Sequence, residues 1–182
     1  MKFAATQLPD VVVIEPVVHA DERGFLMETW REDTYKKAGI DAWFVQDNHS
    51  RSSCGALRGL HYQVNKPQGK LVRVIRGEVF DVAVDLRKSS PTFGQWAGNI
   101  LSADNRKLLW IPPGFAHGFL VLSEFAEFTY RCTDYFAPEH ERTLRWDDAD
   151  IDIDWPLRDG QKPLLSEKDK RGVSLKDAET YA

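Results

Sequence analysis

The sequence predicts an all-β protein, an antiparallel sandwich or barrel, from the pattern of its apolar runs and of its turns. Short runs rich in Val, Ile, Phe, Tyr and Trp dominate the chain, and Gly, Pro, Asp and Ser separate them. Many short strands at even spacing are typical of sandwiches and barrels. Helical patterning is confined to residues 31–38 and to stretches after Asp147.

The expected strands follow one another along most of the chain. Gly77, between Arg76 and Glu78, joins two of them as a tight hairpin because glycine readily adopts a positive φ angle. At 182 residues we expect one domain, with a C-terminal helical or loop segment over about residues 147–182 that forms an outer layer or a lid. The expected strands are 11–18, 24–30, 43–49, 57–63, 71–75, 79–86, 96–101, 107–111, 118–122 and 127–136.

The composition limits the possible classes of function. The formal net charge is −4, so we expect no partner among nucleic acids or anionic membranes. No apolar run approaches the ~20 residues of a membrane span, and the N-terminus lacks the pattern of a signal peptide. Two cysteines make no disulfide framework. We therefore expect a reduced, cytoplasmic protein.

Two segments have the spacing of the cupin jelly roll, but without its usual metal ligands. Metal-binding cupins would place His, His and Glu where this chain has His61, Gln63 and Lys70, and the second segment keeps its histidine as His117. A lysine repels a divalent cation, and Gln is a weak ligand. The sequence therefore predicts a cupin-like jelly-roll barrel with neither a metal nor another cofactor.

Strand alternation places several of these residues on one face. Leu57, Gly59, His61 and Gln63 alternate, so His61 and Gln63 point the same way. Histidines inside a barrel are often only hydrogen-bonded core residues. However, a buried Lys70 beside His61 is costly without a compensating charge. An anionic substrate or a transient enolate would supply that charge.

Five segments stand out in order along the chain, at residues 21–25, 46–50, 57–63, 112–118 and 165–169. Together they resemble one family, the dTDP-4-dehydrorhamnose 3,5-epimerases, and the resemblance extends over nearly the whole chain. It implies a dTDP-4-keto-6-deoxyhexose substrate held by its thymidine diphosphate, and a homodimer whose subunits exchange N-terminal strands. The activity implied is epimerisation at C3 and C5 of dTDP-4-dehydro-6-deoxy-D-glucose, in dTDP-L-rhamnose biosynthesis.

Such epimerisation needs a base, a positive group at the ketone oxygen, and an acid on the opposite face. His61 suits the base because the ordinary pKa of histidine lies near 6.5, and Lys70 suits the enolate oxygen. The resemblance assigns the acid to Tyr130 and the partner of His61 to Asp169. From the residues alone, Asp81 and Asp85 on a nearby strand compete with Asp169 for that role.

The resemblance also implies a set of substrate contacts. Arginine and lysine suit the diphosphate, with Arg23 coming from the partner subunit. Strict alternation puts Arg58 on the face opposite His61, so either Gly59 marks a bulge or Arg58 serves a different subunit. Phe136 follows Tyr130 at even steps in the expected strand 127–136, so it would face the same way as Tyr130 and stack on thymine. The expected contacts are Arg23, Glu28, Gln46, Asp47, Asn48, Arg58, Lys70, His117, Phe136, Glu141 and Lys168.

Three alternatives remain open at this stage. Relatives that epimerise only C3 or only C5 would carry much the same residues. A metal-dependent cupin oxygenase or isomerase is disfavoured by Gln63, Lys70 and Val121 at ligand-like positions. A non-catalytic barrel that binds sugar nucleotides is disfavoured by the presence of both a base and an acid.

Overall fold

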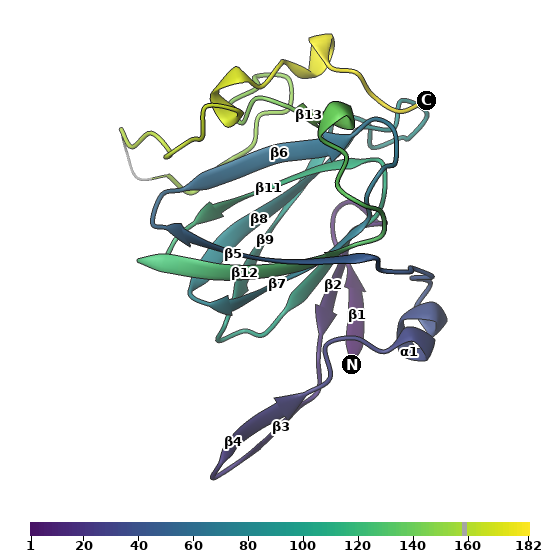
Figure 1. Ribbon diagram of the computed structural model, residues 1–182, viewed down its shortest axis with the longest axis vertical. Coiled ribbons are helices and arrows are strands. Elements are labelled where there is room, and N and C mark those ends of the chain that lie inside the picture. Colours follow the sequence, from purple (N-terminus) through teal and green to yellow (C-terminus); the bar gives the residue numbers. More distant parts are fainter. Residues whose placement is uncertain (158–159) are drawn as a thin grey trace.

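The computed structural model describes residues 1–157 and 160–182, and two antiparallel sheets face each other at its centre (Figure 1). One sheet has the order β1-β2-β10-β7-β12-β5 and the other β13-β6-β11-β8-β9. The all-β jelly-roll prediction is confirmed. The strands are β1 Lys2–Ala5, β2 Val12–Glu15, β3 Val18–Asp21, β4 Gly24–Met27, β5 Gln46–Ser53, β6 Leu57–Gln63, β7 Lys70–Arg76, β8 Glu78–Asp85, β9 Trp96–Ser102, β10 Leu108–Ile111, β11 Phe115–Val121, β12 Phe125–Cys132 and β13 Glu141–Thr143.

Apolar side chains fill the space between the two sheets. Val72 and Val74 of β7 and Phe128 of β12 meet Phe119 of β11, and each is at most 5% exposed. Alternation along each strand sends these residues inward. At one end of this core the inward-facing residues become polar, and a cavity opens there.

A second apolar layer covers the outer face of the five-stranded sheet. Leu57 and Val82 on that face are buried against Ile151 and Trp155 of the C-terminal segment. That segment crosses the outer face of the sheet in Figure 1, as an outer layer over the core. Helical stretches were expected after Asp147, and in the described residues of this segment they are short 3-10 turns, η2 Asp169–Arg171 and η3 Leu175–Asp177.

In the described residues of the C-terminal segment the backbone forms no α-helix, because parts of it pair with the barrel. Isolated parallel bridges join Leu164 to Ala56 and Val173 to Leu144. These bridges satisfy backbone groups that a helix would otherwise pair internally. Residues 158–159, within the expected segment, lie outside the described residues.

Local signals located the other helix and one hairpin correctly. The helix α1 covers Glu32–Lys37, with acidic residues in its first turn and lysines in its last, and a further 3-10 turn, η1, covers Pro138–His140. The β7–β8 hairpin turns at Gly77, whose φ is +77°. None of the helices in the described part of the chain has the length and hydropathy needed to span a membrane.

Several strand bounds differ from the prediction. The expected strand 11–18 is two strands, β2 and β3, separated at Pro16, which lacks the N–H needed to continue a ladder. The strands β1 and β13 were missed, being only four and three residues long. The β3–β4 hairpin projects away from the sheets in Figure 1, and its Phe25 and Leu26 are 55% and 74% exposed.

Candidate active site

A cavity of about 310 Å³ opens between the two sheets. The strands β6 and β11 form one wall, and β5, β7 and β12 form the other. Most of the residues that the sequence singled out face this space. The lining consists of Gln46, Asn48, Ser50, Arg58, His61, Gln68, Lys70, His117, Gly118, Phe119, Phe128, Tyr130, Cys132, Phe136, Glu141 and Lys168.

His61 on β6 is paired with Asp169, although the two lie 108 residues apart in sequence. The Nε2 atom of His61 lies 2.5 Å from Oδ1 of Asp169, which is 3% exposed. Ser166 donates its hydroxyl to the other carboxylate oxygen at 2.7 Å and accepts the Asp169 N–H. With Nε2 donating to Asp169, the Nδ1 atom of His61 carries the lone pair.

The environment favours the neutral form of His61. Burial lowers its pKa, the hydrogen bond to Asp169 opposes this shift, and the charge of Lys168 adds to it. Burial would raise the pKa of Asp169, but hydrogen bonds from His61 and Ser166 outweigh it and hold that pKa below its usual range. The pair is therefore suited to accept a proton near neutral pH.

The two competing aspartates are engaged elsewhere. Asp81 is fully buried, and both of its carboxylate oxygens lie 3.0 Å from Nε2 of His117. Asp85 accepts hydrogen bonds from Arg87 and from nearby hydroxyl groups. His61 and His117 are direct cross-strand neighbours. The cavity wall therefore carries two histidines, each with its own buried carboxylate.

Tyr130 and Lys70 lie on the opposite wall, on β12 and β7 of the six-stranded sheet. Burial raises the pKa of Tyr130, so its phenol keeps the proton at neutral pH. Burial lowers the pKa of Lys70, and the charges of Glu141 and Asp81 oppose that shift. The cavity thus has a histidine on one side and a phenol and a lysine on the other.

Arg58 reaches the same cavity because β6 contains a bulge. The β6–β11 register shifts between His117 and Phe119, opposite Gly59, whose φ is +118°. The extra residue reverses the alternation, so Arg58 and His61 both line the cavity, and Arg58 Nε donates to Ser52 Oγ at 2.8 Å. Of the two explanations left open for Arg58, the bulge at Gly59 is confirmed.

The mouth of the cavity is formed by lining residues that are partly or fully exposed, among them Gln46, Asn48, Arg58, Phe136, Glu141 and Lys168. Lys168 Nζ donates to Glu141 Oε1 at 2.8 Å. Gln46 and Asn48 extend from β5, where the Gln46 amide donates to Asn48 Oδ1 at 3.1 Å. Phe136 is 49% exposed and borders the same space. The mouth therefore combines positive charge, amide groups and an aromatic face.

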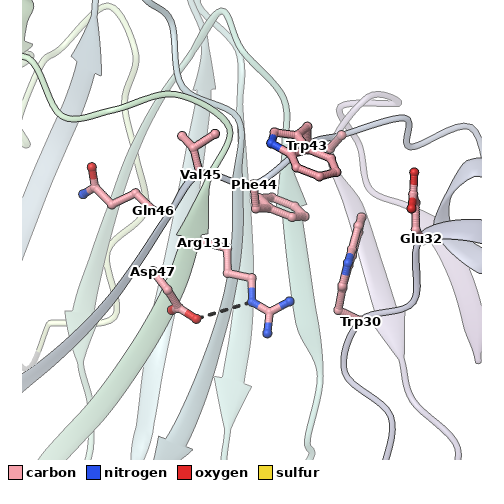
Figure 2. Close-up of a pocket in the computed structure, with 9 residues that line it drawn as sticks. Trp30, Glu32, Trp43, Phe44, Val45, Gln46, Asp47 and Arg131 are labelled. Atoms are coloured by element: carbon pink, nitrogen blue, oxygen red, sulfur yellow. Dashed lines mark ion pairs between the residues drawn. The ribbon is translucent and has the colours of Figure 1, made fainter.

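Three of the expected contact residues do not line the cavity of their own chain. Arg23 is on the projecting hairpin and pairs with Asp21. Glu28 borders a separate hollow beside the hairpin strands. Asp47 faces the outer side of β5, and Figure 2 shows it turned toward Arg131, with 3.4 Å between Oδ2 and Nε. A single chain therefore does not bring these three residues to the cavity.

Comparison with known proteins agrees with this geometry. The sequence profile of a family described as dTDP-4-dehydrorhamnose 3,5-epimerase matches residues 5–177. The chain belongs to this family. A dTDP-4-dehydrorhamnose 3,5-epimerase from Pseudomonas aeruginosa is 57% identical over 182 residues, covering 100% of this chain and 99% of that one. One from Neisseria gonorrhoeae is also 57% identical, and this chain spans 55% of its length.

A solved structure of a relative extends the likeness to three dimensions. It is the dTDP-6-deoxy-D-glucose-3,5-epimerase from Legionella pneumophila Philadelphia 1, in complex with dTDP-4-keto-L-rhamnose. That protein is 51% identical, with a TM-score of 0.94 over 98% of this chain and 94% of its own. The fold of this member of the dTDP-4-dehydrorhamnose 3,5-epimerase family is therefore close to that of a relative bound to a nucleotide sugar.

The epimerase cavity also contains residues that sequence reasoning did not single out. Ser50 belongs to the inward-facing set of β5, so alternation from Gln46 and Asn48 could have found it. Cys132 is the direct strand partner of Lys70. Gln68 precedes β7 in an irregular loop, where no periodic signal exists.

The two histidines of the epimerase do not converge with a third ligand. Among residues 1–157 and 160–182, no three His, Cys, Asp or Glu side chains form a cluster that could hold a metal ion. Lys70 lines the cavity that His61 and His117 share. Metal independence remains a prediction.

Proposed function

We propose that the chain catalyses epimerisation at C3 and C5 of dTDP-4-dehydro-6-deoxy-D-glucose, giving dTDP-4-dehydro-L-rhamnose. The observation that supports this most strongly is the placement of His61 and Tyr130 on opposite walls of one cavity. Inversion at a carbon requires that the proton leaves one face and a new one arrives on the other. A base and an acid on facing sheets meet that requirement.

Each inversion takes two proton transfers. The lone pair of His61 takes the proton from the carbon beside the C4 ketone, and the bond electrons move onto the ketone oxygen as an enolate. Asp169 stabilises the imidazolium that forms, and the ammonium of Lys70 stabilises the enolate oxygen. The enolate electrons then take the phenolic proton of Tyr130 onto the carbon from the opposite face, which re-forms the ketone. His61 releases its extra proton to solvent and Tyr130 recovers one from solvent, so both side chains return to their starting forms.

The substrate's charge is expected to meet the cationic groups at the cavity mouth. Arg58 and Lys168 would bind the diphosphate, and His117 would contact the sugar or the phosphates. All three residues line the cavity, which supports this assignment. The half-exposed ring of Phe136 offers a face for the thymine base. Gln46, Asn48 and Glu141 supply hydrogen-bonding groups for the base and the sugar.

We further propose that the active form is a homodimer with exchanged N-terminal strands. Phe25 and Leu26 are exposed on a hairpin that leaves its own barrel, as expected of a segment that packs on a second copy. Such exchange would bring Arg23 and Glu28, which lie outside the cavity of their own chain, to the partner's site.

We also propose that the protein works in the cytoplasm. The free thiols of Cys54 and Cys132 suit such a reduced setting.

The reaction product tests this proposal. NMR of dTDP-4-dehydro-6-deoxy-D-glucose incubated with the purified protein should show inversion at both C3 and C5. Inversion at one carbon alone would make the protein a single-centre epimerase, and binding without any turnover would make it a non-catalytic barrel.

Removal of metal ions tests the metal-free mechanism. Exhaustive treatment with EDTA should leave the rate unchanged, whereas loss of activity that one metal ion per chain restores would contradict that mechanism.

A further inference from the structure

Gln63 occupies the cupin ligand-like position beside His61, yet its side chain serves the backbone of a neighbouring loop. It is 3% exposed. Its Nε2 atom donates to the carbonyl oxygens of Lys66 at 2.8 Å and Tyr135 at 3.3 Å, and its Oε1 accepts the N–H of Ala137 at 2.9 Å. Both amide N–H groups are therefore used, and Gln63 has no donor left for a substrate.

The loop that Gln63 holds carries Phe136. β12 ends at Cys132, and after the backbone hydrogen bond from the Thr133 N–H to the Gly69 carbonyl, residues 134–137 have no strand ladder to satisfy their backbone. Two further glutamines bind this loop: Gln46 Oε1 accepts the Phe136 N–H at 2.8 Å, and Gln68 Nε2 donates to the Asp134 carbonyl at 2.9 Å. Side-chain amides from β5, β6 and the β6–β7 loop thus replace the missing ladder.

Of the three, Gln63 alone fixes the backbone on both sides of Phe136. It binds the carbonyl of the preceding residue and the N–H of the following one. The Phe136 ring itself is 49% exposed at the cavity edge, where little packing restrains it. The orientation of the ring therefore depends on the backbone that Gln63 holds.

We propose that Gln63 is a positioning residue, which holds Phe136 as a preformed stacking face for the nucleotide base. The inference rests on the proposed function for the identity of the ligand. Holding the loop before binding removes an ordering cost that each binding event would otherwise carry. Gln63 therefore acts on the binding of the nucleotide and leaves the proton transfers at His61 unaffected.

The test is Gln63→Met, which keeps the length of the side chain and removes all its hydrogen bonds. We expect KM for the keto sugar and Kd for dTDP to rise about tenfold, the scale of one lost base–aromatic contact. The value of kcat should stay within about twofold. Gln95→Met, an exposed glutamine outside the cavity, is the control and should change neither constant.

The second arm asks whether Gln63 acts through Phe136. Adding Gln63→Met to Phe136→Ala should raise the Kd for dTDP by less than about twofold beyond Phe136→Ala alone, because the two changes remove one contact. An equal rise in both backgrounds would overturn the proposal. So would a fall in kcat at unchanged KM, or no effect of Gln63→Met on binding.

A folding control keeps the test decisive. If Gln63→Met does not fold, Gln63→Leu removes the same hydrogen bonds to Lys66, Tyr135 and Ala137 with an uncharged side chain that is one atom shorter than Met. The same rise in Kd and the same non-additivity with Phe136→Ala are then expected. Because dTDP binding is measured without turnover, a wild-type protein that lacks epimerase activity would overturn the proposed function and leave this test intact.

Discussion

At the scale of single residues, the chemistry depends on how two neighbouring histidines are paired. His61 and His117 are cross-strand partners, yet Asp169 and Asp81 approach them from different elements. His61 is 23% exposed in its side chain, so its lone pair is accessible from the cavity, whereas His117 is only 8% exposed. This difference supports His61 as the base.

The pH dependence of the reaction follows from the pKa of His61. The base must be neutral, so activity is lost as the pH falls through its pKa, and burial lowers that pKa. We therefore expect the acidic limb of kcat/KM to lie below about pH 6.5, the ordinary histidine value. A profile of kcat/KM against pH measures this directly, and an acidic limb above the ordinary value would contradict it.

Removing the carboxylate of Asp169 should make His61 less basic. The hydrogen bond to Asp169 raises the pKa of His61, so in Asp169→Asn the acidic limb should move to lower pH. The plateau of kcat should fall by roughly 10²-fold, because the imidazolium loses its partner. The matched control is Asp85→Asn, because Asp85 is also a buried aspartate but does not line the cavity. A limb that moves upward in Asp169→Asn would contradict the assignment.

At the scale of elements, the bulge in β6 decides which residues reach the cavity. A Cβ at Gly59 would lie 2.5 Å from Gly118 Cα and 2.7 Å from the His117 carbonyl oxygen. Gly59→Ala should therefore lower the free energy of unfolding by at least about 3 kcal/mol. Gly39→Ala, with φ +87° and nothing within 4 Å of its Cβ, should lower it by only about 1 kcal/mol. Urea unfolding compares the two, and equal losses would contradict the steric argument.

The same element shows how far the sequence could predict the structure. Alternation correctly placed His61 on the inner face but put Arg58 outside, and only the glycine hinted at a bulge. Phe136 was expected to face the cavity by continued alternation from Tyr130. It does line the cavity, but β12 ends at Cys132, so the loop contacts hold Phe136 there and the strand period does not. Strand alternation predicts the direction of a side chain only as far as the strand continues.

Asp169 shows a second limit of prediction from the sequence. Its role in the site depends on a segment that crosses the outer face of the sheet and returns through a 3-10 turn. That path is set by parallel bridges and by tertiary packing, which leave no local pattern in the sequence. Only the family resemblance linked Asp169 to His61. The strand pattern, in contrast, predicted the fold class because two-residue alternation is a local property.

At the scale of the whole molecule, the site is assembled from distant parts. The C-terminal segment brings Lys168 and Asp169, and Tyr181 near the chain end donates its hydroxyl to the Gln63 carbonyl at 2.5 Å. The proposed dimer would add Arg23 from a second chain. Such a site depends on the assembled molecule more than on any one strand.

Subunit mixing tests whether Arg23 serves the partner. Arg23→Ala and His61→Ala homodimers should both be strongly impaired. Refolding the two variants together should restore about a quarter of the wild-type rate. Half of the dimers are then mixed, and in each mixed dimer one site combines an intact His61 with the partner's intact Arg23, while the other site lacks both side chains. Turnover per chain after refolding is the measurement. No recovery, with mixed dimers shown by mass spectrometry, would mean that Arg23 does not complete a neighbour's site.

Solvent exchange tests most directly the claim that His61 and Tyr130 act from opposite walls. In D₂O, NMR of the keto sugar should show deuterium entering at C3 and C5 with the wild type, and none beyond background with His61→Ala. Tyr130→Phe should keep exchange at one position or more while inversion falls by roughly 10²-fold. Full exchange in His61→Ala, or full inversion in Tyr130→Phe, would contradict the account.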